Sequence, residues 1–394
     1  MPTRRLLLAA ALPAIVAARA RAAPSSFAAF LATLRADAGR AGISKATLDR
    51  ALAGIAPNAK VLERDRHQPE FTMTWSQYRA LLITDKRIDA GRAAVRANHA
   101  LLSQVHARYT VPPGVITGIW GLESSFGTQT GDFHVVEALA TLAWEGRRAS
   151  FFHSELIAAL RILDHADVTP GRMTGSYAGA MGQPQFMPSS FYTYAVDFTG
   201  DGRRDIWTSV PDVLASIANY LARSGWRRGL TWGYEVVLPH GFDYRSSHGS
   251  FVEWMRRGVR RADGGALPRT GDGFLLFPSG AGGPAFLVTA NFNVIKLYNN
   301  SDVYALAVGH LGDRMHGGAP FRTAWPKDDP QLSRNARMAL QHKLAGLGYP
   351  VHDFAGRLDF DQRDMIRELQ AKFGMVPDGQ PTPALMARLG LSVR

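Results

Sequence analysis

Glu123 is the side chain of this sequence whose position best suits acid–base chemistry. It ends a helix-like run that begins after Pro112-Pro113, a pair typical of a first helical turn. Three apolar residues precede it at helical spacing and share its face, namely Ile116, Ile119 and Trp120. A carboxylate on an apolar face loses hydration, so we expect a raised pKa, which a general acid near neutral pH requires. The alternative interpretation is a glutamate that turns outward at a frayed helix end.

A second segment, from Gly175 to Ser190, combines glycines, amides and hydroxyl groups. It reads Gly-Ser-Tyr-Ala-Gly-Ala-Met-Gly-Gln-Pro-Gln-Phe-Met-Pro-Ser-Ser. Glycines let a backbone approach a ligand closely, and neutral amides and hydroxyls suit a neutral ligand rich in hydroxyl groups, such as a sugar. The alternative interpretation is a glycine-rich tight turn that packs on a helix.

A third segment places oxygen donors in the order of a calcium-binding loop. The donors are the side chains of Asp197, Thr199, Asp201 and Asp205 and the carbonyl of Arg203. Thr208 stands where such a loop carries its bidentate glutamate, and the loop contains two arginines. A structural calcium is therefore one interpretation, and an Asp-Gly turn held by its own hydrogen bonds is the other.

Composition limits the classes of protein to which the chain could belong. The 394 residues are 46% hydrophobic and include no cysteine, which excludes disulfides, thiolate metal sites and cysteine nucleophiles. The formal net charge of +12 favours an anionic partner. No nucleic-acid-binding motif accompanies that charge, so we predict no nucleic-acid partner.

The first 23 residues have the three-part pattern of an export signal. Arg4 and Arg5 precede an uncharged run from Leu6 to Ala18, which is shorter than the roughly 20 residues that span a bilayer. No cysteine follows that could carry a lipid. We therefore predict a signal peptide over 1–23, a periplasmic product after its removal, and no stable membrane insertion.

Helices are the elements that must position most of these residues. Apolar spacing predicts helices over 26–110, including a long stretch of helical pattern from Lys86 to Tyr109. It then predicts helices alternating with glycine-rich turns over 112–225 and a helix over 301–316. Short apolar runs bounded by glycine and proline predict a few strands, at 236–238, 274–277 and 285–288. Residues 322–330 read as a linker, and three further helices follow within 331–394.

Several motifs of this sequence resemble those of the lytic murein transglycosylases of the membrane-bound lytic transglycosylase B type. They are Trp75-x-x-Tyr78-Arg79, Gly121 to Gly127, Arg147-Arg148-Ala149, Ala180 to Ser190, Ala218-Asn219-Tyr220 and Lys296 to Asn299. The resemblance implies a mainly α (α+β) fold: a lysozyme-like helical catalytic core over 24–321 with a small strand-containing insertion. It also implies non-hydrolytic cleavage of the MurNAc–GlcNAc β-1,4 bond of peptidoglycan glycan strands, which leaves 1,6-anhydroMurNAc ends and requires no cofactor.

The same resemblance assigns roles to residues. Glu123 would be the sole catalytic acid and then base. Sugar contacts would come from Ser176, Gln185 and Asn299, the cleft would be lined by Tyr78, Tyr220, Tyr298 and Tyr304, and Arg148 could meet a carboxylate of the substrate. Phe152 stands where the family often has tyrosine, so a hydroxyl contact there is lost.

Two other functions remain open at this stage. A hydrolytic muramidase would need a second carboxylate, and three acids follow Glu123 in the sequence, at Asp132, Glu137 and Glu145. A non-catalytic cell-wall-binding protein would need none.

The C-terminal residues resemble a three-helix peptidoglycan-binding domain. The motifs are Leu344-x-x-Leu347-Gly348-Tyr349, Ile366-x-x-Leu369-Gln370-x-x-Phe373-Gly374 and Pro377-Asp378-Gly379. The resemblance implies that the cell wall itself is a partner of this protein. A complex of cell-wall synthesis or remodelling proteins is a second partner that the resemblance allows.

Overall fold

The structure is a computed structural model that describes residues 26–66, 74–145, 148–327, 329 and 331–393. The predicted signal peptide, 1–23, and Arg147 of the predicted motifs lie outside the described residues. Within the described ranges, no helix is both long and apolar enough to cross a membrane.

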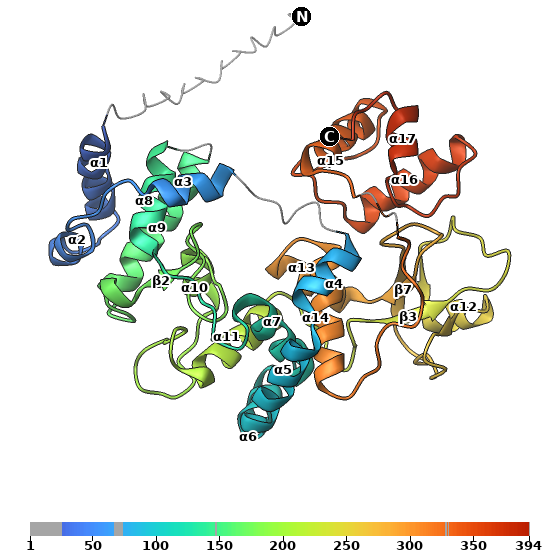
Figure 1. Ribbon diagram of the computed structural model, residues 1–394, viewed down its shortest axis with the longest axis horizontal. Coiled ribbons are helices and arrows are strands. Elements are labelled where there is room, and N and C mark those ends of the chain that lie inside the picture. Colours follow the sequence, from blue (N-terminus) through green and yellow to red (C-terminus); the bar gives the residue numbers. More distant parts are fainter. Residues whose placement is uncertain (1–25, 67–73, 146–147, 328, 330, 394) are drawn as a thin grey trace, which may run out of the picture.

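One group of helices, on the left in Figure 1, packs around its own apolar core. Its members are α1 (Phe27–Arg40), α2 (Lys45–Ala51), α3 (Ala59–Arg66), α8 (Val135–Glu145), α9 (Ala149–Asp164) and α10 (Pro188–Tyr194). A short 3-10 helix (Pro170–Arg172) and a two-stranded antiparallel pair, β1 (Phe133–His134) and β2 (Thr174–Gly175), lie beside it. This group therefore holds the start of the glycine- and amide-rich segment 175–190.

A second group of helices occupies the centre of the molecule (Figure 1). Its members are α4 (Trp75–Leu82), α5 (Asp85–Ala97), α6 (His99–Tyr109), α7 (Pro113–Ser124), α11 (Val210–Arg223), α13 (Ala290–Tyr298) and α14 (Asp302–Met315). Helices α7 and α14 approach closely because glycines line their contact. A Cβ atom on Gly118 would lie 2.4 Å from the carbonyl oxygen of Val308, and one on Gly312 would lie 2.3 Å from that of Gly114. Glycine at these positions thus sets the distance between the helix that carries Glu123 and its neighbour.

The stretch from Lys86 to Tyr109 is helical as predicted, but it consists of two helices, α5 and α6. The chain breaks at Asn98, which ends α5 and begins α6 with φ −112° and ψ 20°. The Asn98 amide donates to the carbonyl of Ala94 at 2.9 Å. A short polar side chain that bonds the nearby backbone competes with helix continuation, and the apolar spacing on either side does not report this.

The strand-containing part is a five-stranded antiparallel sheet in the order β4-β6-β7-β3-β5. Its elements are β3 (Gly233–Val237), β4 (His248–Ser250), α12 (Phe251–Arg256), β5 (Arg260–Arg261), β6 (Asp272–Leu276) and β7 (Ala285–Val288). The three predicted strands correspond to β3, β6 and β7. The edge strands β4 and β5 were not predicted, because they are too short and too polar to produce an apolar run.

The C-terminal unit contains the three predicted helices, α15 (Arg334–Gly346), α16 (Phe360–Lys372) and α17 (Pro383–Arg388), around a separate small core. The unit docks on the sheet, where the rings of Phe274 and Phe360 stack with centroids 4.3 Å apart. The predicted linker, which precedes this unit, also contacts the core, because the ring of Trp325 stacks on that of Trp75 with centroids 5.0 Å apart. The predicted linker is therefore packed against the core at this residue.

Candidate active site

Glu123 lies in the last turn of α7, on the predicted face. Ile116, Ile119 and Trp120 of that face are buried, and Glu123 is half-buried. The hydroxyl of Tyr304, in the first turn of α14, donates a hydrogen bond of 2.6 Å to Oε1 of Glu123. The alternative of a glutamate turned into bulk solvent is thereby excluded.

The environment of Glu123 changes its acidity in the predicted direction. Burial raises the pKa of Glu123 to about 7, while the hydrogen bond from Tyr304 opposes this rise. The same burial, together with the charge of Glu123, holds the pKa of Tyr304 well above its ordinary value, so its hydroxyl keeps its proton. Near neutral pH, Glu123 is therefore able both to give and to take a proton.

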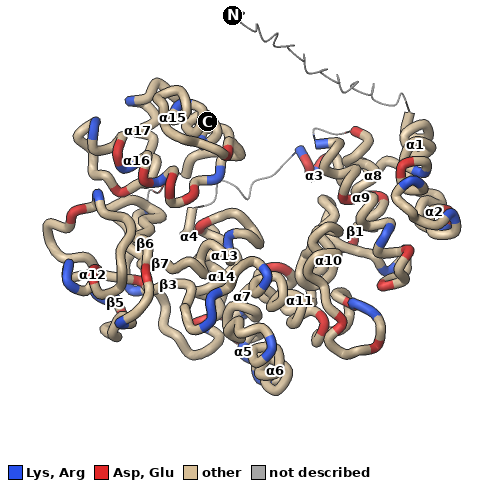
Figure 2. Tube along the Cα trace, turned by 180° about the vertical axis from the view of Figure 1, so that it is seen from behind, with Lys and Arg blue, Asp and Glu red and all other residues tan. Residues whose placement is uncertain are grey.

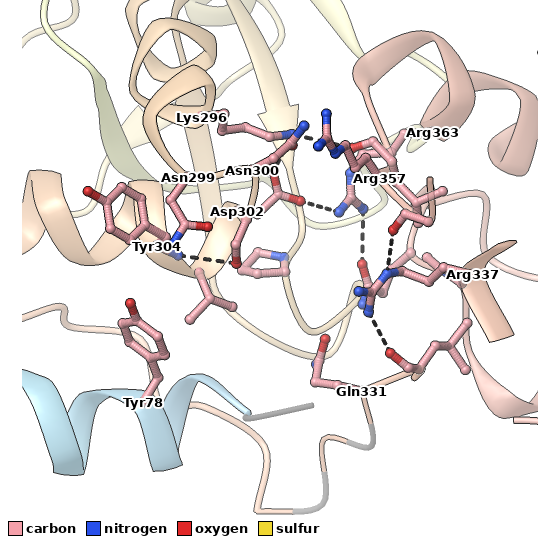
Figure 3. Close-up of a pocket in the computed structure, with 18 of the residues that line it drawn as sticks. Tyr78, Lys296, Asn299, Asn300, Asp302, Tyr304, Gln331, Arg337, Arg357 and Arg363 are labelled. Atoms are coloured by element: carbon pink, nitrogen blue, oxygen red, sulfur yellow. Dashed lines mark hydrogen bonds and ion pairs between the residues drawn. The ribbon is translucent and has the colours of Figure 1, made fainter. Parts of the chain in front are cut away.

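Glu123 lines a pocket of about 410 Å³. Figure 3 shows much of its lining, with Tyr78 and Tyr304 on one side and Arg337, Arg357 and Arg363 on the other. The lining residues of the core are Tyr78, Leu81, Leu82, Leu122, Glu123, Pro278, Lys296 and the continuous segment 299–304. The lining residues of the C-terminal part are Gln331, Leu332, Arg337, Gly356, Arg357, Leu358, Arg363, Gln380 and Pro381. Of the residues predicted to act on a sugar, Tyr78, Asn299 and Tyr304 share this pocket with Glu123.

Tyr220 and Tyr298 lie outside this lining and form an aromatic cluster beside it. Their ring centroids are 4.7 Å apart, and both rings lie within 5.8 Å of Phe186. Their hydroxyls donate to main-chain carbonyls, Tyr220 to Leu297 and Tyr298 to Pro184, each at 2.6 Å. The charge of Glu123 adds to burial in raising the pKa of Tyr298, which places this ring near the carboxyl group. The cluster ties α11 and α13 to the 175–190 segment.

Ser176 and Gln185 are both used within their own loop. The hydroxyl oxygen of Ser176 accepts hydrogen bonds from the amides of Ala178 and Ala180. Gln185 has a positive φ of 52°, and its amide donates to the carbonyls of Thr130 and Gly182 at 2.9 and 2.7 Å. These contacts shape the turn, as the structural interpretation of this segment predicts.

Arg148 lies at the beginning of α9, exposed and outside the pocket of Glu123. Its guanidinium group lies over the ring of Phe152, 4.8 Å from the centroid. Phe152 is buried, so the position where the family often has tyrosine holds a core ring here.

Gln183 has a structural role that sequence reasoning missed. It is buried and accepts a hydrogen bond of 2.8 Å from the indole nitrogen of Trp120, while its own amide donates to the carbonyl of Trp207 at 3.0 Å. It therefore joins the 175–190 segment to α7, one turn before Glu123. Its place among glycines and amides was visible in the sequence, but its partner was not.

The segment 197–208 is a turn held by its own hydrogen bonds. The carboxylate of Asp197 accepts from the amides of Gly200, Asp201 and Gly202, and that of Asp205 accepts from Trp207 and Thr208. The Thr208 hydroxyl at position 12 donates to Asp205. Among the described residues, no group of three or more His, Cys, Asp or Glu side chains could hold a metal ion. In this structure the carboxylates of the predicted donors Asp197 and Asp205 accept from the backbone, while Thr199, Asp201 and the Arg203 carbonyl complete the predicted order, so calcium binding stays a prediction.

None of the three acids that the hydrolytic alternative could use is among the described residues that line the pocket of Glu123. Glu137 accepts a hydrogen bond from Asn58, Glu145 pairs with Arg66, and Asp132 is exposed. The only other acid among the described lining residues is Asp302, which is ion-paired to Lys296 and Arg363. Glu123 is therefore the one carboxyl group of this pocket that is poised to exchange protons.

Among the described residues, Lys and Arg occur on many helices and loops rather than on one element (Figure 2).

Comparison with known proteins identifies relatives of both parts of the chain. A family model for a transglycosylase SLT domain matches residues 26–313, and one for a peptidoglycan-binding domain matches residues 333–389. The chain is 35% identical over 250 residues to membrane-bound lytic murein transglycosylase B of Escherichia coli strain K12, a match of 60% of this chain and 66% of that protein. The match thus spans just under two thirds of that relative's length.

Solved structures agree with this relationship. SltB3 from Pseudomonas aeruginosa, crystallised with NAG-anhNAM-pentapeptide, is 46% identical with a TM-score of 0.84, and the match covers 93% of this chain and all of that one. The lytic transglycosylase Slt35 of Escherichia coli, solved in complex with calcium, is 31% identical with a TM-score of 0.61 over 74% of this chain and 92% of that one. Because the first family model covers most of the chain, the protein belongs to the SLT-domain lytic transglycosylases, lyases that act on peptidoglycan.

Proposed function

We propose that this protein cleaves the MurNAc–GlcNAc β-1,4 bond of peptidoglycan without water, with Glu123 as its single acid and base. The observation that carries the proposal is a half-buried carboxyl group with a pKa of about 7 in a pocket of about 410 Å³. Such a group is protonated often enough to act as an acid and is then basic enough to recover a proton.

The proposed reaction returns the enzyme to its starting protonation state. Protonated Glu123 gives its proton to the glycosidic oxygen as the bond from that oxygen to C1 of the muramoyl ring breaks. The C6 hydroxyl of the same ring then bonds to C1, and the Glu123 carboxylate takes the hydroxyl proton. A 1,6-anhydro ring and a free GlcNAc hydroxyl result, so a second carboxylate is not required.

The proposed binding roles follow from proximity to Glu123. Tyr78 and Asn299 would contact the sugar directly, and Tyr304 would orient Glu123. Ser176, Gln185, Tyr220 and Tyr298 would act chiefly by shaping the loop and helix ends around the glycan, because their polar atoms accept or donate main-chain hydrogen bonds. Arg148, over Phe152, would meet only a distant carboxylate of the substrate.

A pH–rate profile tests the assignment of Glu123. The rate is expected to fall as the pH rises through about 7, because the reaction begins with the protonated acid. In Tyr304→Phe the hydrogen bond that favours the carboxylate is lost, so this limb should move to higher pH. Tyr298→Phe is the matched control, since its hydroxyl bonds Pro184. A limb that moves equally in both variants, or in neither, would contradict the assignment.

We propose the periplasm as the site of action, after export through the predicted signal at 1–23, with glycan strands as the partner. A cell-wall synthesis or remodelling complex is a further proposed partner, and it rests on the peptidoglycan-binding domain alone.

The proposed state of the segment 197–208 is a turn that needs no calcium. Hydrogen bonds lower the pKa of the Asp197 carboxyl group, and the bond from the Gly202 amide has the largest effect. The turn therefore already stabilises the negative charge of Asp197. Millimolar calcium is therefore expected to leave the melting temperature unchanged relative to chelator. A rise that Asp201→Asn abolishes would instead establish a calcium site in this segment.

A further inference from the structure

The pocket that contains Glu123 is built by two parts of the chain that are distant in sequence. One side comes from the core, with Tyr78 and Tyr304, and the other from the C-terminal unit, with Arg337 and Arg357 (Figure 3). A domain predicted only to hold the enzyme on the wall thus supplies part of the lining around its acid.

The C-terminal side is fixed in place rather than tethered. Arg363 pairs with Asp302 of the core, and the Lys296 ammonium donates to the carbonyl of Leu358 at 3.3 Å. Arg367 donates to the carbonyl of Leu275 at 3.0 Å, and Asp378 accepts from the amide of Ala281 at 2.8 Å. With the stacked rings of Phe274 and Phe360, these contacts hold the two sides of the pocket in one arrangement.

The charges around the pocket do not balance. Four cations line it, Lys296, Arg337, Arg357 and Arg363, against two acids, Glu123 and Asp302. Asp302 forms ion pairs with Lys296 and Arg363, and the side chains of both partners are largely buried. Arg337 donates to the carbonyls of Leu332 and Gly356, and no acid of the described chain forms an ion pair with it or with Arg357. Two guanidinium groups therefore line the pocket without an ion pair to a described carboxylate, and Asp302, whose charge also acts on Arg337, is already paired with Lys296 and Arg363.

We propose that Arg337 and Arg357 form a subsite for the carboxylates of the peptide stem carried by the muramoyl residue at Glu123. This inference rests on the proposed function, because only that substrate brings such a stem to the pocket. A planar guanidinium matches a carboxylate in bidentate geometry, and it remains charged at every relevant pH. The C-terminal unit then selects glycan that still bears peptides, while the core provides the chemistry.

The test uses the full chain and two substrates from the same sacculi: glycan strands with their stems, and strands stripped of stems by an amidase. The double variant Arg337→Met and Arg357→Met should lose about tenfold or more in kcat/KM on stem-bearing strands, as expected for a lost charged contact, and change less than about twofold on stripped strands. Arg334→Met is the matched control, because Arg334 is exposed on the same helix and does not line the pocket. It should behave as wild type on both substrates.

Arg357→Met alone keeps the proposal testable if the double variant unfolds. Arg357 is exposed and makes no side-chain hydrogen bond or ion pair within the described residues. The melting temperature of the Arg357→Met protein should therefore equal that of wild type. An equal loss on both substrates, or a loss on neither, would overturn the subsite. Failure of the proposed function itself would look different, since wild type would then release no anhydro ends from either substrate.

Discussion

Glu123→Gln is expected to lower the rate of glycan cleavage by about a hundredfold or more, because it removes the proposed acid and base, whose pKa of about 7 lets it both give and take a proton. Glutamine has nearly the same shape and can still accept the hydrogen bond from Tyr304, so the pocket should keep its form. Glu145→Gln and Asp132→Asn are matched controls, since these acids lie outside the pocket and belong to the hydrolytic alternative. A comparable loss in either control would favour a paired-carboxylate mechanism.

The stability of the same variant reports on the buried charge. The pKa of Glu123 in the folded protein, about 7, is above its ordinary value of 4.5, so the folded state loses stability as the pH rises from 4.5 to about 7, and this loss is complete above pH 7. Glu123→Gln removes this loss, and its melting temperature should exceed that of wild type above pH 7 but not at acidic pH. A variant that is less stable at every pH would mean that the rate loss has a structural cause.

Asp302→Asn is expected to have the largest effect on stability. Burial alone would raise the pKa of Asp302, but the charges and hydrogen bonds of Lys296 and Arg363 lower it to about 2. Its side chain is 13% exposed, and those of its partners are 11% and 8% exposed. Removing the anion leaves two buried cations unpaired, which should cost about 3–5 kcal/mol in the free energy of unfolding. Denaturant unfolding measures this cost.

Lys296→Met is the informative comparison for that variant. It leaves the Asp302–Arg363 pair neutral, so it should cost clearly less than Asp302→Asn. Asp361→Asn, at an exposed position of α16, should change stability by at most about 0.5 kcal/mol. If Lys296→Met were as destabilising as Asp302→Asn, unbalanced charge would not be the cause.

The central helix and its acid could be predicted from the sequence because both depend on local pattern. Pro113 at the start of α7 and the apolar residues one turn apart determine which face is buried, so the raised pKa of Glu123 follows from position alone. The proton donor to Glu123 could not be found in this way. Tyr304 is 181 residues away, and its contact depends on the glycine-lined approach of α14 to α7.

Other features depend on tertiary contacts or on one residue's hydrogen bonds, which a pattern of residue types does not report. The C-terminal side of the pocket arises from docking through Arg363 and Asp302, which no periodicity reveals. Asn98 divides the helical stretch from Lys86 to Tyr109 into two helices, and its amide bonds the carbonyl of Ala94, a break that apolar spacing does not report. The oxygen donors of 197–205 have the order of a calcium loop, and only the structure reveals that the Asp197 carboxylate accepts from backbone amides.

Mass analysis of the products from purified sacculi tests most directly whether one carboxyl group and the substrate's own hydroxyl are sufficient. The proposed reaction yields muropeptides that end in 1,6-anhydroMurNAc, each lighter by one water molecule than the corresponding reducing-end product, and labelled water should leave no oxygen isotope at C1. Reducing ends that carry the isotope would show that water is the nucleophile, and would contradict the account built on Glu123.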